Sequence, residues 1–282
     1  MQSHSTCSDG TLAPAAVVRA AARAGVRLLA LTDHDSVEGL AEAARAAERE
    51  RIRLVAAVEL SFVDGGHQDL HLLGYLIDPH DPALAAALKR ARDERERRAR
   101  AMARALAELG FAVDVAALEA RLARGEAVGR PHVAAAVVGR PENRQRLAAA
   151  GLLDASAFLA AYLVAGRPAF APRTWPEVGE ALDVIHRAGG VAVWAHPFWD
   201  IPAPAEALAT LERFSALGVD GVEAFYVTHT AEQTRLLERR ARELGMLTTG
   251  SSDFHGPEHR SFDRFLAFET HGLEPRLGPI AG

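Results

Sequence analysis

Short apolar runs alternate with helix-like stretches at both ends of this sequence. The runs have the length and composition of buried strands, and they lie at residues 27–31, 54–58, 191–195, 219–225 and 246–249. A sixth run surrounds His71. The stretches between them show helical periodicity, at residues 14–24, 37–49, 175–188, 204–217 and 231–244. Strands joined by helices in this order favour a parallel barrel or an open α/β sheet.

The middle of the chain shows a different pattern. From Pro82 onward, leucine and alanine recur at helical spacing among many arginines and glutamates, which predicts one long amphipathic helix that ends at Gly110. The following residues are rich in alanine, leucine and arginine, show no alternation of period two, and are broken by Gly125, Gly129 and Gly151. We therefore predict three parts, which are a first barrel part at residues 1–81, an all-helical insertion at 82–170 and a second barrel part at 171–282.

Composition argues against several classes of protein. No run of 18 apolar residues is free of charge, and the N-terminus lacks a basic segment followed by an apolar run, so neither membrane spanning nor classical secretion is expected. Cys7 is the only cysteine, which fits a reducing, cytoplasmic setting. Lys89, the only lysine, lies in an arginine-rich helix, which argues against a Walker lysine, a Schiff base or a carbamylated lysine bridging two metals. The net charge of −5 argues against a chain that coats nucleic acid.

Ligand-type side chains follow the predicted strands, at the edge where the strands of a parallel barrel would end. His34 and His196 are examples, and Pro197 is expected to hold His196 extended and to stop a helix from beginning there. His71 lies inside its run, where alternation points it to one face. Each motif alone is common in turns, but their joint placement is hard to produce by chance. The whole set is His4, Asp9, His34, Glu59, His71, His196, Asp253 and His255.

Five imidazoles and three carboxylates in one basin need a counter-charge, because the carboxylates repel one another in a partly dry pocket. Divalent cations remove that conflict. With three or four protein ligands for each ion and carboxylates that bridge, the set suits two or three metal ions. Nitrogen and oxygen ligands without sulfur favour transition metals over calcium. We expect manganese, with iron, zinc or magnesium as alternatives.

Seven motifs occur in order along the chain: HSTCSDG (His4–Gly10), TDHD (Thr32–Asp35), Glu59, HLLGY (His71–Tyr75), RPH (Arg130–His132), AHP (Ala195–Pro197) and GSSDFHG (Gly250–Gly256). In this combination they resemble the polymerase and histidinol phosphatase (PHP) superfamily. More narrowly, they resemble its TrpH-like, stand-alone bacterial phosphoesterases with a helical insertion. The resemblance covers nearly the whole chain, from about Ser3 to Gly256.

The resemblance implies a distorted seven-stranded β/α barrel with an inserted helical subdomain and a trinuclear metal centre on the eight residues named above. It also implies hydrolysis of nucleotide phosphomonoesters by metal-activated water, in the main the 3′-phosphate of nucleoside 3′,5′-bisphosphates. Glu59 is expected to bridge metals. Arg130 and His132 match positions that hold the substrate phosphate, with Arg130 as a planar fork and His132 as a donor or acid toward the leaving oxygen. The residues alone favour the start of a helix there, with Pro131 in its first turn.

The chain departs from the family pattern at its first motif. The family opens with His-x-His, and Gln2 occupies the first histidine position. An amide oxygen binds a hard cation weakly compared with imidazole, so one metal is expected to be loosely held, replaced or missing. Met1 also lies only three residues before His4, which implies either a stub of the first strand or a start codon further upstream.

Three more side chains are candidate substrate contacts. Arg167 and Arg173 lie where the insertion returns to the barrel, and either of them reaches a second phosphate or belongs to a solvated hinge. His229 follows the run at 219–225 and is expected at the rim of the site. The expected binding partner is a small anionic nucleotide or short RNA, with no membrane and no obligate protein partner.

Three alternative functions remain open. The first is a 5′–3′ exoribonuclease on short 5′-phosphorylated RNA. The second is an amidohydrolase, which shares the barrel, histidines and metals but cleaves carbon–nitrogen bonds, and Lys89 is badly placed for its lysine-bridged variety. The third is a metal-poor, non-catalytic or accessory PHP module, which Gln2 keeps open.

Overall fold

The computed structural model describes residues 1–124 and 126–282, so the helix break expected at Gly125 lies outside the described residues. The chain forms two compact units. The first combines Met1–Leu88 with Pro176–Gly282 and is called the sheet unit, and the second, Lys89–Trp175, is called the helical unit. Among the described residues, no helix is both long enough and apolar enough to cross a membrane.

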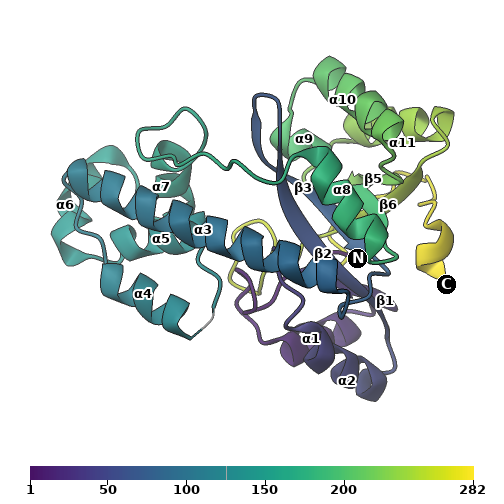
Figure 1. Cartoon of the computed structure of the whole chain (residues 1–282), viewed down its shortest axis with the longest axis horizontal. Helices are drawn as coiled ribbons and strands as arrows, with labels where there is room; N and C mark the ends of the chain where they lie inside the picture. Colours follow the sequence, from purple (N-terminus) through teal and green to yellow (C-terminus); the bar gives the residue numbers. More distant parts are fainter. Residues whose placement is uncertain (125) are drawn as a thin grey trace. The chain divides into compact units, whose positions relative to one another are not determined.

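A curled six-stranded sheet forms the centre of the sheet unit, with the strands side by side in chain order (Figure 1). The strands are β1 (Leu28–Leu31), β2 (Arg53–Asp64), β3 (His67–Tyr75), β4 (Val191–Trp194), β5 (Gly221–Tyr226) and β6 (Leu247–Ser251). All six predicted strands are therefore present. Neighbouring strands are parallel except at β3, which is antiparallel to both β2 and β4.

The expectation of an all-parallel sheet is wrong at β3 because of the short connection before it. Only Gly65 and Gly66 separate β2 from β3. A two-residue hairpin reverses the chain direction, whereas a parallel crossover needs a dozen residues or more. The sequence contained this signal, since paired glycines between two apolar runs are typical of a tight hairpin.

The resemblance implies seven strands, and the described part of the chain contains six. Residues Met1–His4 lie between β1 and the end of β6. The N–H groups of Ala30 and Thr32 donate to the carbonyls of Met1 and Ser3 at 2.8 and 2.9 Å, and the His4 N–H donates to the Phe254 carbonyl at 2.8 Å. This segment therefore fills the gap between the first and last strands with backbone hydrogen bonds, and it brings His4 beside the last strand.

Side-chain alternation gives the sheet two different faces. On the outer face, Leu60 and Phe62 of β2 share a core with the surrounding helices. Those helices are α1 (Pro14–Arg23), α2 (Leu40–Glu50), α8 (Val178–Arg187), α10 (Pro204–Leu217) and α11 (Ala231–Glu243). On the inner face, Ala57 of β2 and Tyr75 of β3 belong to a smaller apolar cluster. Further along these strands the same face carries Glu59 and His71, so the inner face changes from apolar to ligand-type side chains.

The long helix α3 (Pro82–Glu108) begins in the sheet unit, and its part from Lys89 onward forms the centre of the helical unit. Shorter helices follow, namely α4 (Val115–Ala123), α5 (Arg130–Val138), α6 (Arg144–Ala150) and α7 (Ala155–Tyr162). Met102 and Leu106 of α3 pack with Phe111, Val133 and Phe158 in a core of their own. The long amphipathic helix and the short helices predicted from periodicity are therefore present.

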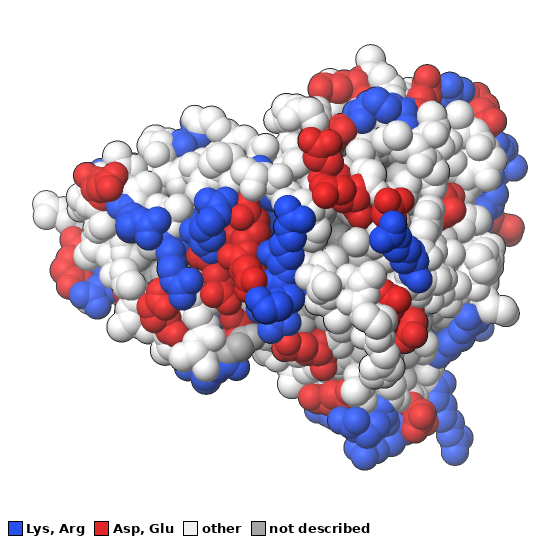
Figure 2. Space-filling model, in the orientation of Figure 1, with Lys and Arg blue, Asp and Glu red and all other residues white. Residues whose placement is uncertain are grey.

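The surface of α3 carries interleaved acidic and basic side chains (Figure 2). Arg97 pairs with Glu94 at 2.7 Å, and Arg100 pairs with Glu96 at 3.4 Å. Arg98, in contrast, is buried, and its Nε donates to the Ala171 carbonyl at 2.9 Å. Most of this charge therefore stays at the surface and is paired locally.

Candidate metal centre

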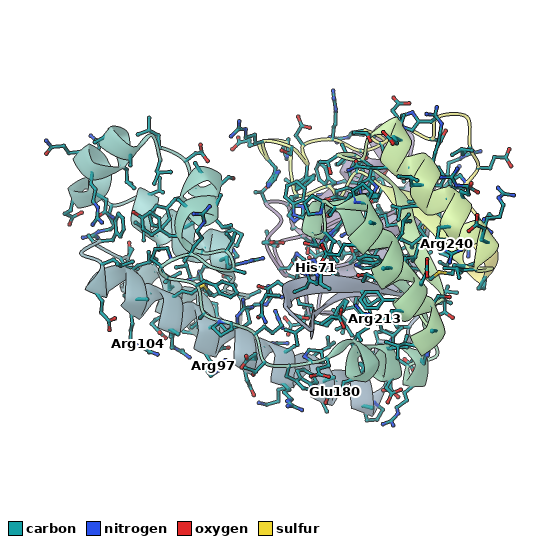
Figure 3. All side chains as sticks on the ribbon, turned by 90° about the horizontal axis from the view of Figure 1, so that it is seen from above. His71, Arg97, Arg104, Glu180, Arg213 and Arg240 are labelled. Carbon is teal, nitrogen blue, oxygen red and sulfur yellow. The ribbon has the colours of Figure 1, made fainter. Side chains whose placement is uncertain are left out.

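All eight predicted ligand side chains lie in one cluster inside the sheet unit. The potential ligand atoms form three groups, and the atoms inside each group all lie within 4.8 Å of one another. The groups are His4, Asp9, His34 and His255; His34, Glu59 and His71; and His4, Glu59 and Asp253. His196 joins the cluster through Nε2, which lies 3.2 Å from Glu59 Oε1 and 3.3 Å from His71 Nδ1. In Figure 3, His71 points from the sheet into the interior of the unit, whereas Arg97 and Arg104 project outward from α3.

Glu59 is the centre of this cluster. It is fully buried, and its carboxylate oxygens lie 3.0 Å from His4 Nε2 and 3.2 Å from His71 Nδ1. Burial by itself raises the pKa of this carboxyl, but the charge of His34 together with hydrogen bonds from His196 and His4 holds that pKa well below its ordinary range. Burial also lowers the pKa of His71 to about 4, which favours the neutral imidazole that binds metals.

The antiparallel strand explains how His71 reaches this cluster from inside its strand. Ser61 of β2 pairs with His71, and Glu59 pairs with Leu73. Because β3 runs opposite to β2, an early residue of β3 lies beside a late residue of β2. Glu59 itself was expected after a strand that ended at Val58, but β2 continues beyond it to Asp64.

His196 is held in an unusual backbone conformation. Its φ of 32° lies in the left-handed region, and a short helix α9 (Pro197–Asp200) begins directly after it. The expectation that Pro197 prevents a helix is therefore wrong, because the fixed φ of proline suits the first turn of a helix. The His196 N–H donates to Glu223 Oε2 at 3.2 Å, which holds this strained residue in place.

Four residues support the cluster through an acid or a hydroxyl group but were not predicted from the sequence. Asp200 Oδ2 lies 3.1 Å from His196 Nδ1, and the Tyr226 hydroxyl donates to Asp253 Oδ2 at 2.8 Å. Glu223 holds His196 as described, and Asp33 accepts from the N–H and hydroxyl of Ser5 at 2.6 and 2.7 Å. Asp200 could have been found from its i,i+4 spacing to His196, and Glu223 from its position as an acid inside an apolar run.

Two buried atoms without hydrogen bonds indicate that this set of ligand atoms fits divalent cations. Nε2 of His4 and Oδ1 of Asp253 are both buried and lie 3.0 Å apart, yet neither makes a hydrogen bond with any described residue. Buried polar atoms are normally hydrogen-bonded, so two converging atoms without partners require an explanation. A cation between imidazole nitrogen and carboxylate oxygen satisfies both atoms.

Sequence comparison identifies the family. The model of the PHP domain matches residues 1–94. A 3′,5′-nucleoside bisphosphate phosphatase of Chromobacterium violaceum is 36% identical over 98% of this chain and 93% of its own length. This chain belongs to the PHP family. A 5′–3′ exoribonuclease of Haemophilus influenzae is 35% identical, over 90% of this chain and 88% of its own.

Solved structures agree with this assignment. An amidohydrolase of Chromobacterium violaceum, with bound sulfate and no metal, has a TM-score of 0.76 at 32% identity and covers 94% of this chain and 89% of its own. A Bifidobacterium adolescentis protein assigned as a metal-dependent phosphoesterase has a TM-score of 0.75 at 29% identity, over 92% and 88% of the two chains. The predicted PHP membership is confirmed, and the names of these relatives support the prediction of a metal-dependent phosphoesterase.

Gln2, at the predicted position of the first histidine, faces the cluster with its nitrogen. The buried side chain donates from Nε2 to Glu59 Oε2 at 2.9 Å, and its Oε1 accepts from the Ser251 hydroxyl at 3.3 Å. This orientation avoids placing the amide oxygen against a carboxylate oxygen. Gln2 therefore serves in this cluster as a hydrogen-bond donor to Glu59.

The predicted substrate contacts from the insertion lie in the helical unit. Arg130 and His132 begin α5, and the Gly129 N–H donates to His132 Nδ1 at 3.1 Å. The residue-based prediction of a helix start at Arg-Pro-His is therefore confirmed. Arg167 is exposed in a turn after α7, and Arg173 is buried.

His229 lies in the sheet unit, after β5. It is buried, its Nδ1 donates to the Ala224 carbonyl at 3.1 Å, and its Nε2 has no hydrogen-bond partner among the described residues. Burial lowers the pKa of His229 to about 4, so the ring is neutral. Its ring lies 5.3 Å from that of Tyr226, the residue that holds Asp253.

Proposed function

We propose that this chain hydrolyses nucleotide phosphomonoesters with two or three bound divalent cations, and that its main reaction removes the 3′-phosphate of nucleoside 3′,5′-bisphosphates. The observation that carries the proposal is the cluster of eight ligands around Glu59, with its unpartnered His4 and Asp253 atoms. The 36% identity to a bisphosphate phosphatase over 98% of the chain supports the choice of substrate. Manganese is the first candidate metal, and iron, zinc or magnesium are alternatives.

The eight ligands divide naturally into three groups when each imidazole is used once. We assign Asp9, His34 and His255 to one ion, Glu59, His71 and His196 to a second, and His4, Glu59 and Asp253 to a third. Only Glu59 is shared, and its two carboxylate oxygens suit a bridge. When bound, the ions activate water and neutralise charge on the phosphoryl oxygens. The third group has three ligands beside Gln2, which makes it the group most open to loss of its ion.

Other residues of the chain position this machinery. Asp200 fixes the orientation of the His196 ring through Nδ1, and the Tyr226 hydroxyl holds Asp253. From the helical unit, Arg130 supplies a planar fork for a phosphate. Because His132 accepts at Nδ1, its neutral ring carries the proton on Nε2, which is then the atom that donates to a phosphate or leaving oxygen. Arg167 and His229 stay predicted substrate contacts.

The helical insertion at residues 82–170 is, in this proposal, a substrate cap on a barrel formed by residues 1–81 and 171–282. The expected partner is a small nucleotide or short RNA, without a membrane or an obligate protein partner. A cytoplasmic setting also stays a prediction, and the single cysteine supports it.

The test is phosphate release by the purified protein loaded with manganese. Adenosine 3′,5′-bisphosphate should yield inorganic phosphate and adenosine 5′-monophosphate, and metal analysis should give two or three equivalents for each chain. The proposal fails if metal-loaded protein releases no phosphate from this substrate. Absence of bound metal together with inactivity on every phosphoester would favour the accessory-module alternative.

A second candidate function is 5′–3′ exoribonuclease activity on short RNA. Relatives with that name, from Haemophilus influenzae and Escherichia coli, are 35% and 31% identical over 90% and 91% of this chain. Substrate length separates the two functions. A 5′-phosphorylated tetraribonucleotide should yield mononucleotides if the chain is an exoribonuclease, and should stay intact if it acts on bisphosphates alone.

A further inference from the structure

An exposed tryptophan stands beside the metal centre of the sheet unit. Trp199 lies in α9, three residues after the ligand His196, and 53% of its surface is exposed. The other two tryptophans are different, because Trp194 is fully buried and Trp175 is half-buried in the helical unit. Tryptophan buries more apolar surface than most residues, so one that stays largely exposed at the rim of a site suggests a binding role.

Trp199 is the outer end of a row of aromatic rings that leads to a metal ligand. Its ring contacts Phe262 edge-on, with centroids 5.5 Å apart. Phe262 stacks on His259 at 5.0 Å and 19°, and it lies 5.5 Å from the ligand His255. We call Trp199, His259 and Phe262 the aromatic rim. Two ring contacts therefore separate the exposed indole from the metal cluster.

Hydrogen bonds hold both ends of this row. The backbone N–H of Trp199 donates to the backbone carbonyl of His196 at 2.9 Å, which ties the backbone of the tryptophan to that of a ligand residue. His259 Nδ1 accepts from the N–H groups of Ser261 and Phe262 at 3.3 and 3.1 Å. These hydrogen bonds hold the backbone of α9 and of the turn that carries His259 and Phe262, and such preorganisation reduces the entropy cost of binding.

We propose that the aromatic rim is the nucleobase subsite, in which Trp199 stacks on the base of a nucleotide whose scissile phosphate lies at the metal cluster. This inference rests on the proposed function. It assigns a contact to the base, which is the part of the substrate that the metal ions do not bind. Every base has a π-face, so a stacking platform accepts all four bases. The chain should therefore bind nucleotides in preference to sugar phosphates while discriminating weakly among bases.

The test compares two substrates and two proteins. Adenosine 3′,5′-bisphosphate is compared with its abasic analogue, in which a tetrahydrofuran ring replaces the nucleoside. Trp199→Ala should raise KM for the adenosine compound by about 10-fold, within the range seen for loss of one base stack. KM for the abasic compound should change by less than about two-fold, because this compound has no base contact to lose. The kcat values for both compounds should stay unchanged. Trp199→Phe, which keeps an aromatic face, should fall between.

Controls separate this effect from general damage. Leu217→Ala removes another exposed apolar side chain, 49% exposed at the end of α10, and should leave both KM values unchanged. An equal rise of KM for both substrates in Trp199→Ala would overturn the base subsite, and so would no rise for either. Thermal unfolding of the variants confirms that each is folded.

Fluorescence keeps the inference testable if turnover is absent. Adenosine 5′-monophosphate should quench the wild-type emission, and Trp199→Phe should lose that quenching because Trp194 and Trp175 are less accessible. Quenching without hydrolysis of any phosphoester would refute the proposed reaction and retain the subsite. Hydrolysis of the bisphosphate without quenching of Trp199 would retain the proposed reaction and refute the base subsite. Quenching by a control peptide as strong as that by the nucleotide would identify the rim as a protein-docking surface instead.

Discussion

Acidic side chains have opposite surroundings in the two units. In the helical unit, Asp93 is 62% exposed and pairs with Lys89 at 2.7 Å, and Glu119 pairs with Arg100 at 2.8 Å, both at the surface. In the sheet unit, Glu59 and Asp253 are 0% and 5% exposed and lie against imidazoles. Surface pairs stay hydrated, whereas the buried acids have lost their water.

This difference distinguishes the buried acids, which serve the chemistry of the site, from the exposed acids, which keep the surface hydrated. Buried carboxylates that converge with imidazole nitrogens form the donor set of a divalent cation, and two of these buried atoms, His4 Nε2 and Asp253 Oδ1, make no hydrogen bond with any described residue. An exposed carboxylate beside a guanidinium has its counter-ion already and contributes little. Substitutions in the buried cluster should therefore have large effects on activity and metal binding, and substitutions among the surface pairs should have almost none.

The largest expected effect comes from Asp253→Ala. This change removes a carboxylate that lies 3.0 Å from His4 Nε2 and accepts from the Tyr226 hydroxyl. We expect kcat/KM to fall by about 10³-fold or more, because charge stabilisation by a metal site is worth several kcal/mol. Phosphate release and metal content measure the effect. Asp253→Asn keeps the shape and loses the charge, so it should show a similar loss; a fully active Asp253→Ala would mean that the ligand set is wrong.

Removal of metal should destabilise the protein. Without cations the buried acids repel one another, and an ion bound only by the folded state stabilises it by mass action. At a free ion concentration of about 100 times Kd, each site adds about 2.7 kcal/mol. Thermal unfolding after chelation should therefore occur at a lower temperature, and manganese should restore it. An identical melting temperature with and without chelator would show that the cluster is stable empty.

Asp200→Asn should weaken metal binding without removing a ligand. Asp200 lies 3.1 Å from His196 Nδ1, and loss of such a carboxylate typically costs about 10- to 100-fold in metal affinity. The matched control is Asp220→Asn, because Asp220 also pairs with a histidine, His186, at 2.9 Å, but outside the cluster. Calorimetric titration with manganese should give a higher Kd only for Asp200→Asn. Equal affinities in both variants would assign Asp200 no role in positioning His196.

Much of the fold could be predicted because its signals are local. Apolar runs and helical periodicity located all six strands and the long helix α3. The direction of β3 was missed because it depends on the hairpin at Gly65 and Gly66, a feature of two residues. The helix after His196 was missed because two rules for proline compete, and the one that favours a helix start applied.

The candidate site was predictable for a related reason. Most side chains that bind transition metals are histidines, cysteines or acids, so eight histidines and acids beside apolar runs are visible in a sequence. Supporting residues carry no such restriction. Tyr226 lies in a strand with an apolar sequence pattern, which hides its polar role. The proposed role of Trp199 depends on its solvent exposure, which cannot be predicted from the sequence. Spatial relations such as these require a structure.

Arg130→Ala tests whether the helical unit takes part in the reaction. Arg130 begins α5 next to His132, and it is proposed to hold a substrate phosphate by a bidentate contact. Loss of one such charge-assisted contact should raise KM by about 10-fold and leave kcat nearly unchanged, since it binds ground state and transition state alike. Arg97→Ala, in an ion pair with Glu94 on α3, is the control and should leave KM unchanged. Equal KM values for both variants would remove Arg130 from the substrate contacts.

The smallest expected effect is that of Lys89→Met, at the only lysine of the chain. Lys89 is 76% exposed and pairs with Asp93, four residues further along α3, at 2.7 Å. Such i,i+4 pairs are worth about 0.3–0.5 kcal/mol, so the midpoint of denaturant unfolding should hardly move. Turnover should stay within about two-fold of wild type, because an imidazole and carboxylate cluster needs no ammonium group. A large loss of turnover in a stably folded Lys89→Met would show that surface charge and chemistry are not separate in this chain, and it would reopen the lysine-dependent mechanisms that its composition argues against.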